Sequence, residues 1–355
     1  MTDMLFARRS APFIAPQGQV TLVMRQVLFA LLPAALAHVY FFGPGLLFNV
    51  IIATIFCLAT EAVALQLRNR PALPALQDYS AVVTAVLLAF ALPPLTPWWV
   101  TATASVFAIG VAKHLYGGIG YNIFNPAMAG YVVVLLAFPF EMNFWTAPHI
   151  GDLDYQHLGV LQSLGYTLSG SLPEGFTFDA LTRATPLDAA QSGFAAMQIF
   201  EEIHQNPLMG DFAGRGWEWI ANFVAIGGLW LLYRGIIRWH IPVAVILGVM
   251  VPATFFYLFG AGANASPGFH LFGGATLLCA FFIATDPVSA ATSPRGRIIY
   301  GLGIGLLIYA IRRWGSYADG VAFAVLLMNM AAPAIDYFTV PRIAGHDHNG
   351  KGDDS

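Results

Sequence analysis

Two hydroxyl-bearing residues, Thr182 and Thr185, stand in the one long polar segment of a chain that is otherwise almost entirely apolar. The sequence around them reads DALTRATPLD from Asp179 to Asp188. A threonine hydroxyl in an exposed loop is a nucleophile that a transferase can reach, so it can accept a phosphoester. A Thr-Pro pair in a loop is also typical of a turn, in which the neighbouring Asp side chains cap helices. Features elsewhere in the sequence are needed to distinguish these two interpretations.

Carboxylates within long apolar runs are the second group of candidates. Glu61 lies deepest, in the run 45–67, and Asp319 stands where a later run begins. A charged group in hydrocarbon costs about 2.5–3.5 kcal/mol on insertion scales, so Glu61 either lines an ion pathway or pairs with a cation. The other carboxylates stand at the ends of runs, where helix capping is the simpler explanation. These are Asp78, Asp286 and Asp336.

Two helix-breaking stretches interrupt the apolar runs. One is Gly117–Pro126 and the other is Thr285–Ser289. A break at membrane depth leaves backbone groups unpaired unless a cavity, a cofactor or another helix satisfies them. Both stretches therefore either line a functional site or are ordinary turns between helices.

The composition excludes several classes of protein. Of 355 residues, 57% are hydrophobic and 10% charged, with a mean hydropathy of +0.67, whereas soluble domains carry about 25% charged residues. The two lysines, Lys113 and Lys351, provide no basic face for nucleic acid. Cys57 and Cys279 lie in apolar runs outside any Cys-x-x-Cys pattern, and the histidines lack metal-ligand spacing. We expect a membrane protein without a metal centre of its own.

The apolar runs predict an all-α polytopic protein of about ten spans, since one crossing takes about 20 apolar residues. The expected spans are 23–42, 45–67, 79–95, 97–115, 123–140, 216–233, 239–259, 268–286, 298–314 and 318–335. They divide the chain into an N-terminal segment 1–22, a five-helix unit 23–140, a loop 141–215, a five-helix unit 216–335 and a polar tail 336–355.

The distribution of Arg and Lys predicts the orientation, because cytoplasmic loops carry the excess of positive charge. With alternating spans, most of these residues fall on one side, which places both termini in the cytoplasm and the acidic loop 141–215 in the periplasm. Arg312 and Arg313 fall on the opposite side. They are either buried functional charges or a sign that the ninth span is misplaced.

The two five-span units resemble each other weakly. The stretch 113–136 parallels 312–327, and 87–94 parallels 280–287. Because five is odd, a repeated five-span unit emerges with inverted topology. Inverted repeats are typical of transporters, whose sites lie between the halves near interrupted helices.

The residues around Thr185 resemble a known sequence motif. Asp179, Thr182 and Thr185 match the motif read by flavin transferases, in which Asp is followed by Ser or Thr and then by Ala-Thr. Ala180 and Arg183 stand where that motif commonly has Gly. The stretches 125–127 and 285–289, and the layout of the whole chain, resemble the same family. It comprises the D subunit of the Rnf electron-transport complex and the B subunit of the sodium-translocating NADH:quinone oxidoreductase.

The resemblance implies an inner-membrane subunit of an assembly that moves electrons between NADH and ferredoxin while translocating Na⁺ or H⁺. It implies FMN on Thr185 through a phosphoester, with Thr182 and Asp179 as motif context and Arg183 placed to interact with the phosphate. Non-covalent riboflavin belongs to the same expectation, with no residues assigned. The implied partners are the other membrane and peripheral subunits, including a second flavinylated one, a flavin transferase and membrane lipid.

Alternatives differ in whether a flavin is present. The short segment before the first span favours the Rnf subunit over the quinone oxidoreductase subunit, which carries a longer N-terminal arm. A small-solute transporter or channel without a redox role would explain the repeat, and a structural scaffold would explain the spans. Neither needs an acceptor motif in an outward-facing loop.

Overall fold

The computed structural model describes residues 17–151 and 155–339, and these form helices joined by loops. Within those residues, the only strand-like pairings are two isolated bridges, one of which joins Thr146 to Thr182. The helices before the long loop are α1 (Gln17–Phe42), α2 (Gly45–Leu67), α3 (Ala72–Leu76), α4 (Ser80–Ala91), α5 (Trp98–Val106), a π-helix (Phe107–Leu115) and α6 (Pro126–Ala137).

The helices from the long loop onward complete the described chain. Those of the loop are α7 (Pro139–Met142), α8 (Val160–Ser169), α9 (Phe178–Leu181), α10 (Pro186–Ala195) and α11 (Phe200–His204). Those after it are α12 (Trp217–Tyr233), α13 (His240–Phe259), a 3₁₀-helix (Ala261–Ala263), α14 (Pro267–Phe272), α15 (Thr276–Leu278), a π-helix (Cys279–Ile283), α16 (Pro294–Trp314) and α17 (Val321–Thr339).

Four of these helices begin with the same local signal, a capping side chain followed by proline. Asn125, Thr185, Ser266 and Ser293 each accept a hydrogen bond from the backbone N–H three residues later. Proline fits the next position because its fixed φ is helical and its missing N–H would have no helical partner. Local chemistry therefore determines where α6, α10, α14 and α16 begin.

The structure contains four helices that are long and apolar enough to cross a membrane: α1, α2, α13 and α17. A fifth is counted if the pair Ala261–Phe272 and Thr276–Ile283, bent by 46°, is one broken span. Each of the ten predicted spans contains helix, but α4 and α6 are shorter apolar helices.

Several helices have limits that differ from those of the predicted spans. The span 79–95 is helical only to Ala91, because Pro93 and Pro94 follow, and the span 123–140 starts at Pro126. The predicted continuous span 268–286 is broken after Phe272. Gly274 has φ +62° there, a left-handed conformation that a helix cannot contain.

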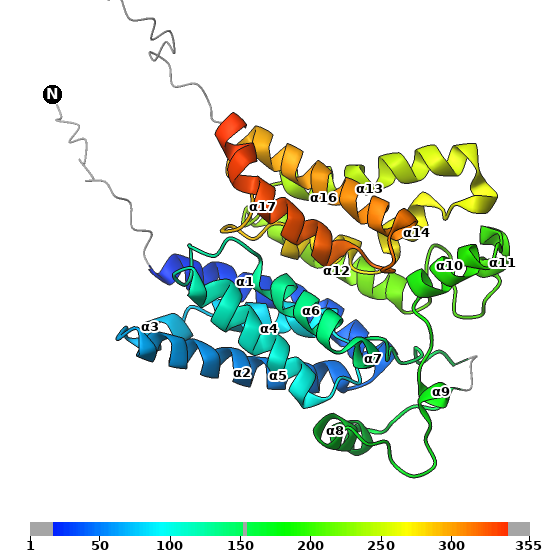
Figure 1. The fold of residues 1–355 in the computed structure, drawn as a ribbon, viewed down its shortest axis with the longest axis horizontal. Coiled ribbons are helices and arrows are strands. Elements are labelled where there is room, and N and C mark those ends of the chain that lie inside the picture. The colour runs from blue at the N-terminus through cyan, green and yellow to red at the C-terminus, as the bar shows by residue number, and fades with distance from the viewer. Residues whose placement is uncertain (1–16, 152–154, 340–355) are drawn as a thin grey trace, which may run out of the picture.

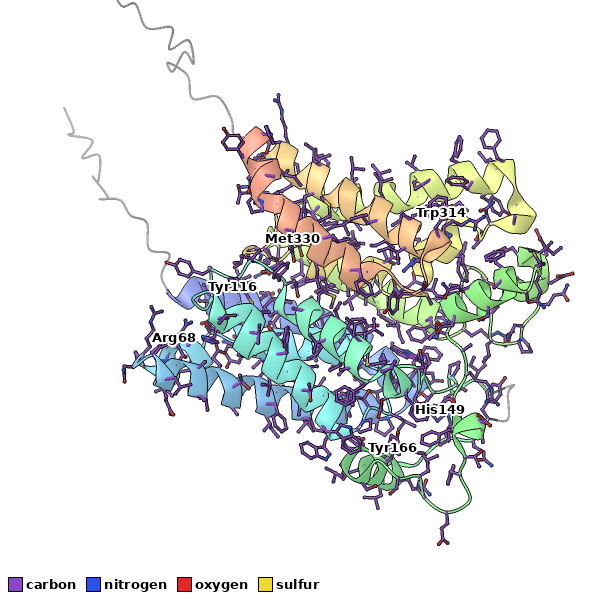
Figure 2. All side chains as sticks on the ribbon, viewed as in Figure 1. Arg68, Tyr116, His149, Tyr166, Trp314 and Met330 are labelled. Atoms are coloured by element: carbon purple, nitrogen blue, oxygen red, sulfur yellow. The ribbon has the colours of Figure 1, made fainter. Side chains whose placement is uncertain are left out.

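The helices form two groups that lie side by side, α1–α6 and α12–α17 (Figure 1). Helix α1 packs on α12, and α6 packs on α17. A Cβ on Gly227 of α12 would lie 2.1 Å from the Ala30 carbonyl oxygen of α1, so glycine is needed for this close approach. Outward-facing apolar residues such as Trp314 and Met330 are more than 60% exposed, as expected of a lipid-facing surface (Figure 2).

The long loop is divided between the two groups. Leu158, Tyr166 and Leu181 of its first part pack with Leu95, beside the first group. The second part, α10 and α11, packs with α14 of the second group through a cluster that includes Leu187, Phe200 and Phe269. The extended segment 182–185 therefore crosses from one group to the other.

Candidate functional site

Thr185 lies at this crossing, as the capping residue of α10. Its Oγ1 accepts a hydrogen bond from the Asp188 N–H at 3.2 Å and donates one to Asp188 Oδ2 at 2.5 Å. The side chain is half-buried. The predicted acceptor hydroxyl is thus held by a carboxylate and keeps access to its surroundings.

The other predicted motif residues hold the segment in place. Thr182 Oγ1 donates to the Phe178 carbonyl at 2.8 Å, and the Arg183 N–H donates to the Trp145 carbonyl at 2.9 Å. The Arg183 guanidinium donates to the Thr182 carbonyl at 2.6 Å and to the Asp179 carbonyl, and it lies 4.7 Å from the centre of the Tyr155 ring. Asp179 itself stands in the first turn of α9. Arg183 therefore braces the backbone just before Thr185.

A cavity of about 170 Å³ lies between the two helix groups, and Thr185 and Asp188 line it. The first group contributes His38, Met128 and Tyr131, and the second contributes Val224 and Asp319 among others. Trp145 and Trp217 also line it, with ring centres 4.8 Å apart. Most of the lining is apolar or aromatic, which is typical of sites for planar organic ligands.

His38 is the most unusual residue of this cavity. It is 2% exposed, and neither of its ring nitrogens has a hydrogen-bond partner among the described residues. A buried polar group without a partner costs about 1–3 kcal/mol. A ligand with hydrogen-bonding ring atoms would satisfy it.

A second, smaller pocket adjoins Thr185 on another side. Arg183 and Arg215 line it together with Thr146 and Asn206. Two positively charged residues beside one pocket favour an anion such as a phosphate. Thr185 thus stands between an aromatic cavity and a basic pocket.

The electrostatics around Asp188 follow from its position. Burial raises the pKa of the Asp188 carboxyl, and the hydrogen bonds from Thr185 oppose this shift. The carboxylate of Asp319 raises the pKa of Asp188 further. The net result is a pKa of Asp188 above that of an ordinary aspartate.

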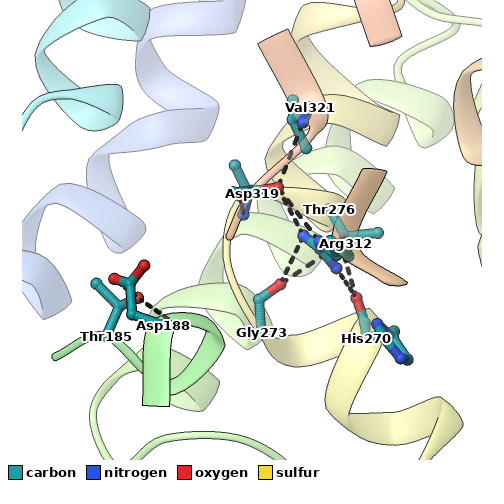
Figure 3. A network of polar contacts seen from close by, with 9 residues as sticks. Thr185, Asp188, His270, Gly273, Thr276, Arg312, Asp319 and Val321 are labelled. Carbon is teal, nitrogen blue, oxygen red and sulfur yellow. Dashed lines mark hydrogen bonds and ion pairs between the residues drawn. The ribbon is translucent and has the colours of Figure 1, made fainter. Parts of the chain in front are cut away.

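Arg312 explains how the chain tolerates the break after α14. It is 8% exposed and donates to the carbonyls of His270 at 2.7 Å and Gly273 at 3.2 Å, and it pairs with Asp319 at 2.9 Å (Figure 3). Asp319 also accepts the Ala275 N–H at 2.9 Å. These contacts satisfy backbone groups that the break frees. Of the two interpretations of Arg312, the structure supports a buried charge.

Glu61 is held in a separate buried cluster. Its Oε1 lies 2.5 Å from Lys113 Nζ and 3.3 Å from His114 Nε2, and Lys113 also donates to Ser80 Oγ at 2.8 Å. Glu61 and Lys113 are 1% and 3% exposed. Glu61 does not line the cavity beside Thr185, so these two predicted site residues belong to different places.

The two helix-breaking stretches meet where the halves touch. The Asn125 side chain donates to the Ile283 carbonyl at 3.2 Å, and the Asn125 N–H donates to Asn329 Oδ1 at 2.9 Å. Asn329 in turn donates to the Ser289 carbonyl at 3.1 Å. The breaks are therefore joined to each other through two buried asparagines.

The remaining sequence expectations concern carboxylates and cysteines. Asp78 and Asp286 each accept the backbone N–H two residues later, as in a capping turn. Asp336 instead lies within α17 and accepts the Thr292 N–H, which comes just before α16, so its contact is between helices. Both cysteines are free and buried. Among residues 17–151 and 155–339, no group of His, Cys, Asp or Glu has the arrangement of a metal site.

Sequence reasoning missed His38 and the paired tryptophans as part of the site. They come from distant parts of the chain, and only packing brings them to Thr185. Asp188 did carry a signal, because it stands three residues after a Thr-Pro helix start. That position was interpreted only as a cap.

The described residues form helices, and several of these are apolar and long enough to cross a membrane, so the chain is a multi-pass membrane protein. Thr185 lines a largely apolar and aromatic cavity between its two helix groups. The chain belongs to the NQR2, RnfD, RnfE family, whose model matches residues 7–345. This confirms the family resemblance found in the sequence.

The chain is similar over nearly its whole length to the D subunits of ion-translocating oxidoreductase complexes from several bacteria. The protein of Aliivibrio salmonicida is 46% identical over 350 residues, covering 97% of this chain and 99% of the relative. That of Vibrio cholerae is 47% identical, covering 97% and 100%. That of Ectopseudomonas mendocina is 49% identical over 345 residues, covering 97% of each.

Proposed function

We propose that the protein is the D subunit of an Rnf-type ion-translocating oxidoreductase in the bacterial inner membrane and carries FMN as a phosphoester on Thr185. The observation that carries this proposal is the position of the Thr185 hydroxyl, between an aromatic cavity and a basic pocket. The identity of 46–49% to relatives of that type over 97% of the chain supports the same assembly. The protein is one component of a translocase and does not act alone.

The residues around Thr185 fit an FMN group. His38 offers an unpartnered ring nitrogen to the heteroatoms of a flavin ring, and the indoles of Trp145 and Trp217 offer apolar surface. Arg183 and Arg215 line the pocket that suits the phosphate. A bound flavin supplies one- or two-electron transfer, and the protein supplies placement and electrostatics. Non-covalent riboflavin elsewhere in the membrane region is part of the proposal, without assigned residues.

The packing supports two inverted repeats and a periplasmic loop. The first helices of the two halves pack together, α1 on α12, and so do the last ones, α6 on α17. The start of α1 and the end of α17 lie at one end of the helices, and α8 to α11 lie at the other (Figure 1). This arrangement agrees with cytoplasmic termini and an outward loop, where a transferase and a partner flavoprotein have access.

Coupling requires an ion path separate from the flavin. Electrons pass between NADH and ferredoxin through the assembled complex, and Na⁺ or H⁺ crosses the membrane. Glu61 is the residue we assign to that path, because its Oε2 has no hydrogen-bond partner among the described residues although the group is buried. An acceptor oxygen in that state is available to a cation.

The test is to detect a flavin on the chain itself. When the chain is coexpressed with a flavin transferase, the denatured band fluoresces under ultraviolet light, and the labelled peptide contains Thr185. Thr185→Ala abolishes both signals, whereas Thr185→Ser, which keeps a hydroxyl, retains them. If the alanine variant fluoresces as strongly as wild type, Thr185 is not the acceptor.

A second candidate follows from the family, which also includes NQR2. In this alternative the chain is the B subunit of a sodium-translocating NADH:quinone oxidoreductase. Purification of the complex decides between the two, since electron transfer to quinone would favour this alternative and electron transfer to ferredoxin would favour the Rnf-type complex. A transporter without a redox role and a structural scaffold are the remaining alternatives, and both predict no fluorescence from the wild-type band.

A further inference from the structure

The carboxylate of Asp188 has a geometry that helix capping does not explain. In a capping box, the third helical residue accepts a hydrogen bond from the backbone N–H of the capping residue. In α11 Glu202 does this, because its Oε2 accepts from the Ile199 N–H at 3.2 Å. In α10 the corresponding residue, Asp188, instead accepts the side-chain hydroxyl of Thr185 at 2.5 Å. Its oxygen lies where a base would remove the hydroxyl proton.

We propose that Asp188 is the base that takes the Thr185 proton when the flavin is attached, so that the chain supplies part of the chemistry of its own modification. The inference rests on the proposed function, since it presumes that Thr185 is the acceptor. A threonine hydroxyl is a weak nucleophile until an adjacent base activates it. The hydrogen bond also orients Oγ1, because the Asp188 N–H holds the same oxygen from the backbone side at 3.2 Å.

The step balances with a flavin dinucleotide as donor. An ester does not form from free FMN and an alcohol in water without an activated phosphate, so the donor must carry a phosphoanhydride. Thr185 Oγ1 forms a bond to the flavin-side phosphorus, and the phosphoanhydride bond breaks. The nucleoside monophosphate leaves with the electron pair, and the proton moves from Oγ1 to Asp188 Oδ2. No oxidation or reduction occurs.

Several groups share the surroundings of Asp188. Tyr131 of α6, Tyr317 and Asp319 before α17, and His38 of α1 line the same cavity. Arg312 of α16 lies behind Asp319 and pairs with it at 2.9 Å. Burial and Asp319 both raise the pKa of Asp188, so its ionised fraction rises with pH over a range closer to neutrality than that of an exposed aspartate. Figure 3 shows Asp188 bound to Thr185 and apart from the Arg312–Asp319 pair.

The substitution Asp188→Asn tests the role of Asp188 as a base while keeping its hydrogen bond to Thr185. The amide oxygen still accepts the Thr185 hydroxyl, but it cannot take a proton at neutral pH. Purified full-length chain in detergent is mixed with the transferase and the flavin dinucleotide, and flavin on the Thr185 peptide is followed by mass spectrometry. General base catalysis contributes typically 10²–10⁴-fold, so labelling slows by about 100-fold or more. Glu202→Gln is the matched control, because it alters the cap of α11 and leaves labelling at the wild-type rate.

The pH dependence of the labelling rate distinguishes a base from a residue with only a structural role, because only a base changes the rate as it ionises. The ratio of wild-type to Asp188→Asn rates cancels the titration of the transferase, and it rises with pH as Asp188 ionises. Asp188→Asn labelling at the wild-type rate, or a ratio that does not change with pH, overturns the role of Asp188. Labelling of Thr185→Ala would overturn the proposed function instead, so the two failures are distinguishable. Equal thermal stability of the Asn and wild-type chains excludes misfolding as the cause of slow labelling.

Discussion

The Thr185 oxygen has two roles that are compatible with each other. As a cap it accepts the Asp188 N–H, and as a hydroxyl it donates to the Asp188 carboxylate. An esterified oxygen has lost its proton but keeps a lone pair, so the cap of α10 survives modification. The chain therefore carries its proposed flavin on an atom whose structural contact does not depend on the hydroxyl proton.

Thr185, Thr182, Asp179 and Arg183 could be named from the sequence because the motif that they resemble is local, and their part in flavin attachment stays a prediction. The sequence was not sufficient to find His38, which reaches the cavity only when α1 packs beside α12. It also suggested that Arg183 serves the phosphate. The structure adds a backbone role, since the Arg183 guanidinium donates to two carbonyls.

A pair of loop histidines should make this region sensitive to acid. The rings of His149 and His157 stack with centres 3.5 Å apart. Burial, and then His149, lowers the pKa of His157 to about 4. Because the folded pKa lies below the unfolded value of about 6.5, stability is lost as pH falls from about 6.5 towards 4.

The expected loss is about 1 kcal/mol, reduced because the ring is partly exposed to solvent. Hydrogen exchange of the amides near Leu158 at pH 7 and pH 5 measures it. His157→Gln removes the difference between the two pH values, and His204→Gln, a matched substitution elsewhere in the loop, retains it. An unchanged pH response in His157→Gln would contradict the assignment.

At the scale of elements, glycines also allow a close contact between α13 and α16. A Cβ on Gly305 would lie 2.3 Å from the Val245 carbonyl oxygen and 2.7 Å from the Gly248 Cα. Gly301, one turn earlier, faces the Ala244 side chain in the same way. Small residues four apart let the two backbones approach closely, as in other membrane helix pairs.

Gly305→Ala should separate α13 from α16 and destabilise the protein by about 1–3 kcal/mol, the usual effect of overpacking. Thermal unfolding in detergent measures the change. Gly165→Ala in α8 is the matched control, since nothing lies within 4 Å of its Cβ position. There the substitution stabilises by about 0.5–1 kcal/mol through lower chain entropy. Equal melting temperatures for Gly305→Ala and wild type would rule out the close contact.

The sequence displays local signals for helix starts, although the predicted spans 123–140 and 298–314 begin at other residues than α6 and α16. The pairs Asn125-Pro126 and Ser293-Pro294 set starts through local chemistry that the sequence displays. The break within 268–286 depends on Arg312, whose guanidinium has only N–H donors and brings them to carbonyls that the break leaves free. Hydropathy treats Gly273-Gly274 as part of an apolar run, and the partner that makes a break tolerable lies in another helix.

At the scale of the whole molecule, the two halves each hold an ion pair, one buried and one partly buried. Glu61 and Lys113 pair between α2 and the first π-helix, and Arg312 and Asp319 pair between α16 and the segment before α17. Glu61, Asp319 and Arg312 stand out in the sequence as charges at unusual positions. The sequence does not show that Glu61 pairs with Lys113, because the two residues are distant in the chain.

Replacing Glu61 with Gln should impair ion transport by the assembled complex, because the carboxylate is the acceptor that we assign to the path. The same change leaves Lys113 buried without its anion, which costs about 3–5 kcal/mol. The double variant Glu61→Gln with Lys113→Gln removes both charges and restores assembly. Ion uptake into vesicles that hold the complex is the measurement. Wild-type uptake by the assembled double variant would remove Glu61 from the path.

The cavity beside Thr185 can form only after the acceptor residue has been synthesised. Its walls include Asp319 and Val321, which the ribosome adds more than a hundred residues after Thr185. At roughly 5–20 residues per second, that interval is about 10 s. During it the acceptor threonine is already synthesised while part of the cavity wall is not. Maturation of the site is therefore completed only when α17 has taken its place.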